Sequence, residues 1–101
     1  MLAVFSIVPV GVGSSIGAQL AEVLRIVDES GLPYKINPMG TVIEGEWDEV
    51  MKLVKKCHKN VMKNGERAVT TISIDDRKGK PNRIEAKVKS IERRLGKSLK
   101  K

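Results

Sequence analysis

The sequence is poor in the residues from which many small domains build metal sites and aromatic cores. Its 101 residues include one cysteine, one histidine and only three aromatic residues. A single cysteine, Cys57, excludes an internal disulfide and fits a reducing compartment. Its neighbour His58 has no second Cys or His to complete a zinc site, so we expect Cys57 to pack in an aliphatic core. We predict no metal and no cofactor.

Long hydrophobic runs are also missing. None approaches the ~20 residues that a membrane-spanning helix needs. The opening segment MLAVFSIVPVGVG lacks the basic start of a signal peptide, so it is interpreted as a buried strand. We therefore expect one cytoplasmic domain over residues 1–101, with no membrane contact.

Charge is present but unevenly spread. Of the net charge of +7, residues 77–101 carry +9, so the first 76 residues sum to −2. Domains of this size that bind RNA on a sheet stack bases on aromatic side chains of the central strands, and here the first strand offers only Phe5. The basic segment is therefore interpreted as a solvated helix face, and nucleic-acid binding stays an alternative.

Periodicity and turn residues divide the chain into seven elements. We expect four strands, at residues 2–9, 34–37, 41–46 and 67–75, and three helices, at about 15–30, 47–63 and 84–95. The last residues, 96–101, are expected to fray as a basic tail.

The order β-α-β-β-α-β with a terminal helix predicts an α+β fold. Right-handed crossovers place the third strand between the first and second, which gives a ferredoxin-like βαββαβ antiparallel sheet with an additional C-terminal helix. Both earlier helices then cover one face of the sheet. Neither side of the fourth strand is frankly polar, since Val69, Thr71 and Ser73 alternate with mostly apolar residues. We therefore expect a homo-oligomer, a dimer or tetramer, formed through the sheet.

The glycine-rich segment GVGSSIG follows the first strand and precedes a helix. Such a turn can cradle an anion at a helix N-terminus. Its spacing is GxGxxxG, and the next strand ends without an acidic residue to bind a ribose. A turn with Ser14 or Ser15 as helix cap is the favoured interpretation.

Glu44 is the most unusual residue, because it lies in a strand that the topology places inside the sheet. Val42 and Glu44 point to the same side. A carboxylate there needs a cationic or hydrogen-bonding partner, since burying it alone is costly. The partner is an arginine of this chain or of a neighbour, the start of the following helix, or a ligand. The sequence leaves the structural and ligand-binding interpretations open.

Four segments together resemble the small thiamine-binding protein family (YkoF-like): VPVG, the block NPMGTVIEGEWDEVM, His58 and IDDR. The resemblance covers essentially the whole chain. It implies a ferredoxin-like subunit in dimers and commonly tetramers. It also implies binding of thiamine or its hydroxymethylpyrimidine part, without a known reaction.

The resemblance implies a small-molecule site in that block. Glu44 and Thr41 lie within it, Asn37 borders it, and Ser6 is added from the first strand, with Met39 or Trp47 as an apolar wall. A carboxylate and an amide suit the donor and acceptor edge of an aminopyrimidine. The prediction is a non-enzymatic, cytoplasmic protein that binds thiamine or its hydroxymethylpyrimidine part as a homo-oligomer, a dimer or tetramer. The alternatives are a nucleic-acid-binding domain that uses the basic C-terminal helix and a regulatory subunit that senses another small metabolite.

Overall fold

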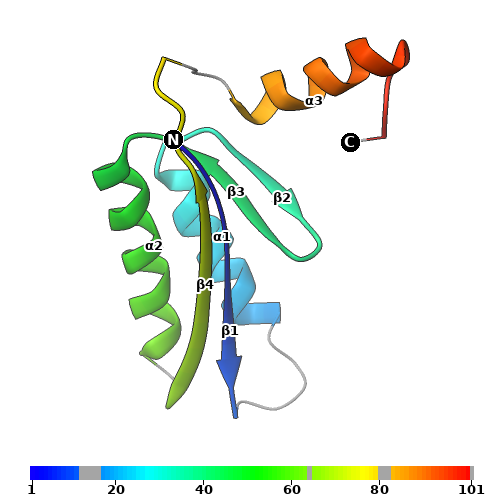
Figure 1. Ribbon diagram of the computed structural model, residues 1–101. Helices are drawn as coiled ribbons and strands as arrows, with labels where there is room; N and C mark the ends of the chain where they lie inside the picture. Colours follow the sequence, from blue (N-terminus) through cyan, green and yellow to red (C-terminus); the bar gives the residue numbers. More distant parts are fainter. Residues whose placement is uncertain (12–16, 64, 80–82, 101) are drawn as a thin grey trace.

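The computed structural model describes residues 1–11, 17–63, 65–79 and 83–100. Within these ranges, seven elements follow in the predicted order (Figure 1). They are β1 (Leu2–Val10), α1 (Gly17–Glu29), β2 (Tyr34–Asn37), β3 (Gly40–Glu44), α2 (Trp47–Met62), β4 (Arg67–Asp75) and α3 (Arg83–Leu95). The expected Ser14 or Ser15 cap and most of GVGSSIG lie outside the described residues.

The four strands form one antiparallel sheet in the order β2-β3-β1-β4. This order confirms the predicted α+β, ferredoxin-like fold with its additional C-terminal helix. β1 pairs with β4 along its whole length, from Leu2 to Val10. Its pairing with β3 covers only Leu2 to Phe5. One edge of the second half of β1 is therefore left without β3.

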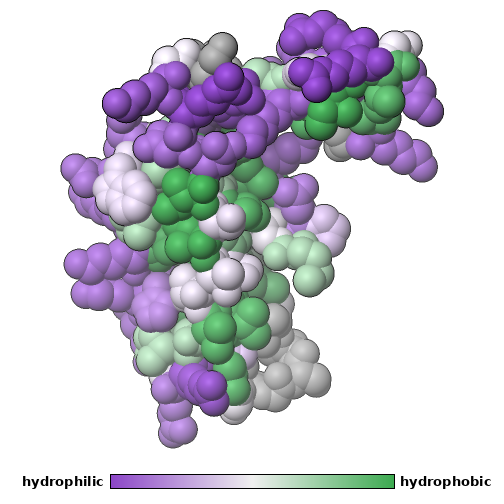
Figure 2. Space-filling view, in the orientation of Figure 1, coloured by the Kyte–Doolittle hydropathy of each residue, from purple (hydrophilic) through white to green (hydrophobic). Residues whose placement is uncertain are grey.

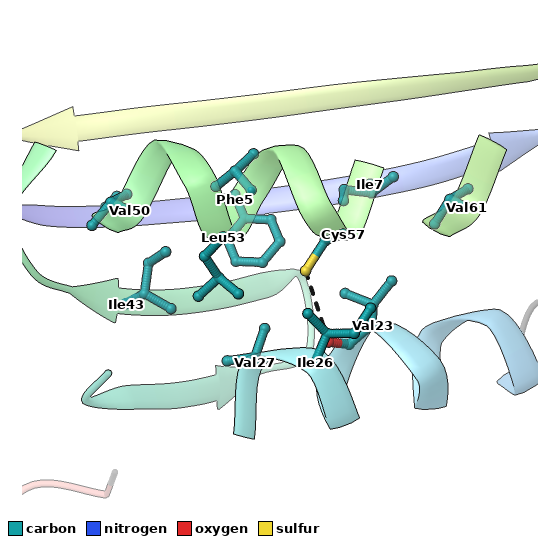
Figure 3. Packing of buried hydrophobic residues seen from close by; sticks show 12 residues of the cluster. Phe5, Ile7, Val23, Ile26, Val27, Ile43, Val50, Leu53, Cys57 and Val61 are labelled. Carbon is teal, nitrogen blue, oxygen red and sulfur yellow. Dashed lines mark hydrogen bonds between the residues drawn. The ribbon is translucent and has the colours of Figure 1, made fainter. Parts of the chain in front are cut away.

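The core lies between the sheet and the two helices α1 and α2 (Figure 3). Every second residue of β1 and β3 faces the helices and packs against one apolar side of α1 and one of α2. This follows from the side-chain periods of 2 residues in a strand and 3.6 residues in a helix. The buried apolar residues are Ala3, Phe5, Ile7, Val23, Ile26, Val27, Ile43, Val50, Leu53, Val54, Cys57 and Val61. Only Phe5 among them is aromatic, so the predicted aliphatic core is confirmed.

The carboxylates after β3 stabilise the start of α2. Glu46 is the N-cap, and its backbone N–H donates to the Glu49 side chain at 3.0 Å in a reciprocal capping box. Asp48 and Glu49 also lie in the first turn, where the helix dipole favours negative charge. Most of the acidic cluster in residues 44–49 is thus explained by helix initiation.

Within the described residues, no helix covers the other face of the sheet, and valines of β1 and β4 are exposed there. Val4, Val8, Val10 and Val69 keep 38–48% of their surface exposed. We call this surface, with the intervening Ser6 and Thr71, the open face. In Figure 2 hydrophobic side chains run along the middle of this side of the molecule. The exposed side of β4 carries Arg67, Val69, Thr71, Ser73 and Asp75, so the expectation that neither side of this strand is frankly polar is wrong. The open face is apolar mainly along β1.

α3 projects from the end of the sheet near the N-terminus (Figure 1). None of its residues is buried. The radius of gyration is 15.1 Å, larger than the roughly 13 Å typical of a 100-residue domain. Within the described residues, each helix is too short or too polar to cross a bilayer.

Candidate functional site

A cavity of about 400 Å³ lies between the β2–β3 turn, β1 and α1, and we call it the hairpin cavity. Three of the four predicted site residues line it: Ser6, Asn37 and Thr41. The turn residues Pro38, Met39 and Gly40 also line it, but 89% of the surface of Met39 is exposed, so Met39 forms little of the wall. The remaining lining residues are apolar: Phe5, Ile7, Val8, Leu20, Val23, Leu24 and Ile36.

The hairpin cavity exists because the β2–β3 hairpin is shorter than β1. The last residue pair between β1 and β3 joins Phe5 to Thr41, and β2 pairs with β3 from Tyr34 to Asn37. β1 continues to Val10 beside β4 alone. The hairpin therefore ends halfway along β1, and the side chains of α1 form the opposite wall.

Backbone groups of β1 point into this gap. Met1 O accepts a hydrogen bond from Gly45 N at 3.0 Å, and Phe5 O points at Gly40. Alternate residues of a strand direct their backbone groups to the same side, so Ile7 directs its N–H and C=O toward the cavity. Within the described residues, β3 has no residue paired with Ile7. One donor and one acceptor thus stand side by side at the cavity wall.

Gly40 permits this close approach of the turn to β1. A Cβ atom at residue 40 would lie 3.0 Å from Phe5 O. That distance is too short for an unstrained carbon–oxygen contact, so a side chain there would push the turn away from β1. The residue type at this position therefore helps to set the width of the hairpin cavity.

The lining of the hairpin cavity is typical of a small-molecule site. Its lining residues are mostly apolar, and the polar ones are Ser6, Asn37 and Thr41. Only 7% of the surface of Thr41 is exposed. Ligand cavities of about 300–1,000 Å³ with a few placed polar groups are common. None of the described lining residues is charged.

Glu44, the fourth predicted site residue, lies at the other end of β3. Its Oε2 accepts a hydrogen bond from Arg83 N at 3.0 Å, and its Oε1 accepts one from Ile84 N at 3.2 Å. These are two of the free N–H groups at the start of α3, where negative charge is favoured. The partner of the carboxylate is thus the backbone of Arg83 rather than its side chain.

Glu44 borders a second cavity, of about 440 Å³, beside α3. Its lining includes Tyr34, Glu85 and Lys89, so it is more polar and lies apart from the three other predicted residues. Trp47, the other predicted apolar wall, lines neither cavity. The hydrogen bonds of Glu44 favour the structural interpretation that the sequence left open.

Cys57 and His58 take separate structural positions. Cys57 is buried in the core, with its Sγ 3.9 Å from Val23 O (Figure 3), which confirms its predicted packing role. Burial raises the pKa of its thiol to about 11 and so suppresses the reactive thiolate. His58 Nδ1 lies 2.6 Å from Thr70 Oγ1. Among the described residues, no three potential metal ligands are grouped to hold an ion.

Similarity to other proteins extends over most of the chain. A family model described as "Thiamine-binding protein" matches residues 3–92. The UPF0045 protein MJ1052 of Methanocaldococcus jannaschii is 37% identical over 91 residues, which covers 90% of this chain and 91% of that protein. The UPF0045 protein YqgV of Bacillus subtilis is 32% identical over 96 residues, with coverage of 89% and 92%.

Solved structures agree with these relationships. The crystal structure of the hypothetical protein MJ1052 has a TM-score of 0.83 and 38% identity, and the match covers 89% of this chain and 93% of that chain. A putative thiamine biosynthesis/salvage protein from Thermotoga maritima shares the fold, with a TM-score of 0.78, 24% identity and coverage of 89% and 96%. Because the family model matches nearly the whole chain, the protein belongs to the thiamine-binding protein family.

Proposed function

We propose that the protein binds thiamine through its hydroxymethylpyrimidine part in the hairpin cavity and catalyses no reaction. The observation that carries this proposal is the meeting of Ser6, Asn37 and Thr41 at one cavity in a chain of the thiamine-binding family. These three residues come from three different strands. Their convergence follows from the short hairpin and not from closeness in the sequence.

The hairpin cavity suits the hydrogen-bonding edge of an aminopyrimidine. This edge offers an acceptor ring nitrogen beside a donor amino group. The backbone N–H and C=O of Ile7 supply the matching donor and acceptor, and the Asn37 amide supplies a second such pair. Leu20 and Leu24 of α1 lie in the wall against which the ring would pack.

The uncharged lining favours the pyrimidine over the thiazolium part of thiamine. A cation held away from water needs a carboxylate partner, and the described lining contains none. We therefore place the thiazolium ring toward the solvent-exposed mouth of the cavity. The predicted role of Glu44 in binding is not part of this proposal, because its carboxylate is held by α3.

The same lining accounts for binding without catalysis. Its polar groups are hydroxyls, one amide and backbone atoms, and none of the described lining residues is a general acid or base with a pKa near neutral. The exposed valines of the open face support the further proposal that the binding unit is a homo-oligomer, a dimer or tetramer.

Calorimetry with hydroxymethylpyrimidine and thiamine tests the proposal. Both should bind, and Asn37→Ala should weaken binding roughly 2- to 12-fold, because a neutral hydrogen bond contributes about 0.5–1.5 kcal/mol. Lys35→Ala is the matched control, since Lys35 lies two residues away on the same strand and outside the cavity lining. Absence of binding by both compounds at millimolar concentration would contradict the proposal.

A further inference from the structure

The solvent-facing side of α2 carries a row of lysines. Their spacing of i, i+3, i+4, i+7 and i+11 places them on one side of the helix, and all are exposed: Lys52, Lys55, Lys56, Lys59 and Lys63. We call these residues the lysine row. The buried residues of α2, from Val50 to Val61, lie on the opposite side. The row therefore faces solvent over its length of about 16 Å.

The lysine row has no counter-charges of its own. Within the described residues, none of its members forms an ion pair with a carboxylate. A helix dipole favours cations near the C-terminus, but this effect is confined to the last turn. It therefore accounts for Lys59 and Lys63 and not for the lysines nearer the start of α2.

A groove lies beside the first part of the lysine row, where α1 ends and α2 begins. It has a volume of about 300 Å³, and we call it the helix groove. Apolar residues from both helices and the following turn contribute to it, together with charged residues and one serine. The lining residues are Ile26, Glu29, Ser30, Leu32, Glu49, Lys52, Leu53 and Lys56. None of these residues lines the hairpin cavity.

The charged groups of the helix groove are not equally available. Glu29 accepts hydrogen bonds from Arg25 at 3.1 Å, and Glu49 accepts one from the N-cap backbone of α2 at 3.0 Å. Lys52 and Lys56 have no such partner among the described residues. The groups left to bind a partner are therefore two cations beside apolar residues. Their complement is an apolar group with negative charge next to it.

We propose that the helix groove and the lysine row form a docking site for an acidic segment of a partner protein. One apolar side chain of the segment enters the groove, and its carboxylates pair with the lysine row. About five residues of an extended chain span 16 Å. The groove lies at the lower end of the roughly 300–1,000 Å³ range of ligand cavities, so it suits one aliphatic side chain better than a cofactor. This inference goes beyond the proposed ligand binding and does not depend on it.

Two other polyanions fit this surface less well. Phosphate groups are bound best by the planar fork of arginine, whereas every member of the row is a lysine. The apolar residues of the groove also offer nothing to a phosphate backbone. A helix that binds a membrane surface inserts its apolar side, but the apolar side of α2 is buried in the core (Figure 3). A protein segment uses both the apolar and the cationic part of the site.

Fluorescence anisotropy with a labelled peptide tests the docking site on the full chain. The probe is one leucine between two runs of four glutamates. It should bind saturably at physiological ionic strength and more tightly at low salt, where charges are less screened. Replacing its leucine by serine keeps the charge and should weaken binding roughly 10-fold or more, because the apolar burial is lost.

Protein variants locate the binding surface. Lys56→Glu combined with Lys59→Glu reverses two charges of the row and should weaken binding of the leucine peptide roughly 10-fold or more. The matched control combines Lys35→Glu with Lys89→Glu, which changes the net charge equally but on β2 and α3. It should alter the affinity less than about 2-fold at physiological ionic strength, where distant exposed charges are screened. Circular dichroism should show that both variants are folded.

Three results would overturn the docking site: no saturable binding of the leucine peptide, equal binding of the serine peptide, or an equal loss in the control variant. A phosphatidylserine vesicle or a DNA duplex might bind more tightly than the peptide and lose that binding in the Lys56→Glu, Lys59→Glu variant; this result would also overturn it. The same variant should bind hydroxymethylpyrimidine with unchanged affinity, because the hairpin cavity shares no residue with the groove. Failure of the unmodified protein to bind hydroxymethylpyrimidine would affect the proposed function alone.

Discussion

The βαββαβ body and α3 both carry apolar residues at regular helical or strand spacing, but these residues are buried in the body and exposed in α3. In the body, the stripes of α1 and α2 meet alternating residues of β1 and β3, and residues such as Val27, Ile43 and Val50 become fully buried. In α3, a stripe of comparable regularity leaves every residue at least partly exposed. An amphipathic pattern therefore predicts a helix, but the location of its partner depends on where the chain anchors that helix.

The two regions also differ in what holds them. The body is stabilised by burial of apolar surface over one continuous core. α3 is held by polar contacts at its first turns, from Glu44 and Asp75. We therefore expect the body to unfold cooperatively and α3 to respond to changes that leave the body intact.

The largest effect is expected in the core. Ile43→Ala removes a fully buried side chain and should lower the free energy of unfolding by about 2–5 kcal/mol. Leu95→Ala, measured at concentrations where the protein is monomeric, should change it by less than about 0.5 kcal/mol. Urea denaturation followed by circular dichroism gives both values. Equal losses would show that α3 belongs to the cooperative unit of the body.

A smaller and more local effect is expected at Glu44. Glu44→Gln keeps the side-chain shape but removes the charge that accepts hydrogen bonds from Arg83 and Ile84. Loss of these interactions should destabilise the start of α3 by about 1.5–3 kcal/mol, visible as faster amide exchange in α3. Affinity for hydroxymethylpyrimidine should stay unchanged. A loss of affinity with unchanged exchange would instead place Glu44 in the binding site.

The smallest effect is expected at the exposed anchor. Asp75→Asn removes the ion pair with Lys87 and serves as the control for Glu44→Gln, with little change in amide exchange. Lys87 lowers the pKa of Asp75, so its contribution is present at neutral pH and is lost as the pH falls through that lowered pKa. A response to Asp75→Asn as large as that to Glu44→Gln would contradict this ranking.

Most of the fold could be predicted because it depends on local patterns. Alternating residues, helical stripes and turn residues such as Gly31 and Gly40 locate the elements, and crossover handedness orders the strands. The three polar residues of the hairpin cavity were also predicted, but from resemblance to a family. The residue types alone predict hydrogen-bonding groups, but they do not predict that these three residues lie at one cavity.

Two features of the site depend on contacts that no local pattern determines. The hairpin ends opposite Phe5, so the backbone of Ile7 borders the cavity instead of pairing with β3. This arrangement depends on the register between β1 and β3, which lie far apart in the sequence. Glu44 meets the start of α3, 39 residues further along the chain. In the sequence, the only indication of this contact was that Glu44 has no local partner for its carboxylate. That indication did not distinguish a helix N-terminus from a bound ligand as the partner.

The most direct test of the account is a titration of the isotope-labelled protein with hydroxymethylpyrimidine, followed by NMR. Amide signals around the hairpin cavity should shift, above all those of Ser6, Ile7 and Thr41. Signals of Ile91 and Leu95 in α3 should stay in place. Shifts concentrated at Glu44, Ile84 and Lys89, around the second cavity, would contradict the proposed site, and an unchanged spectrum would contradict the proposed function.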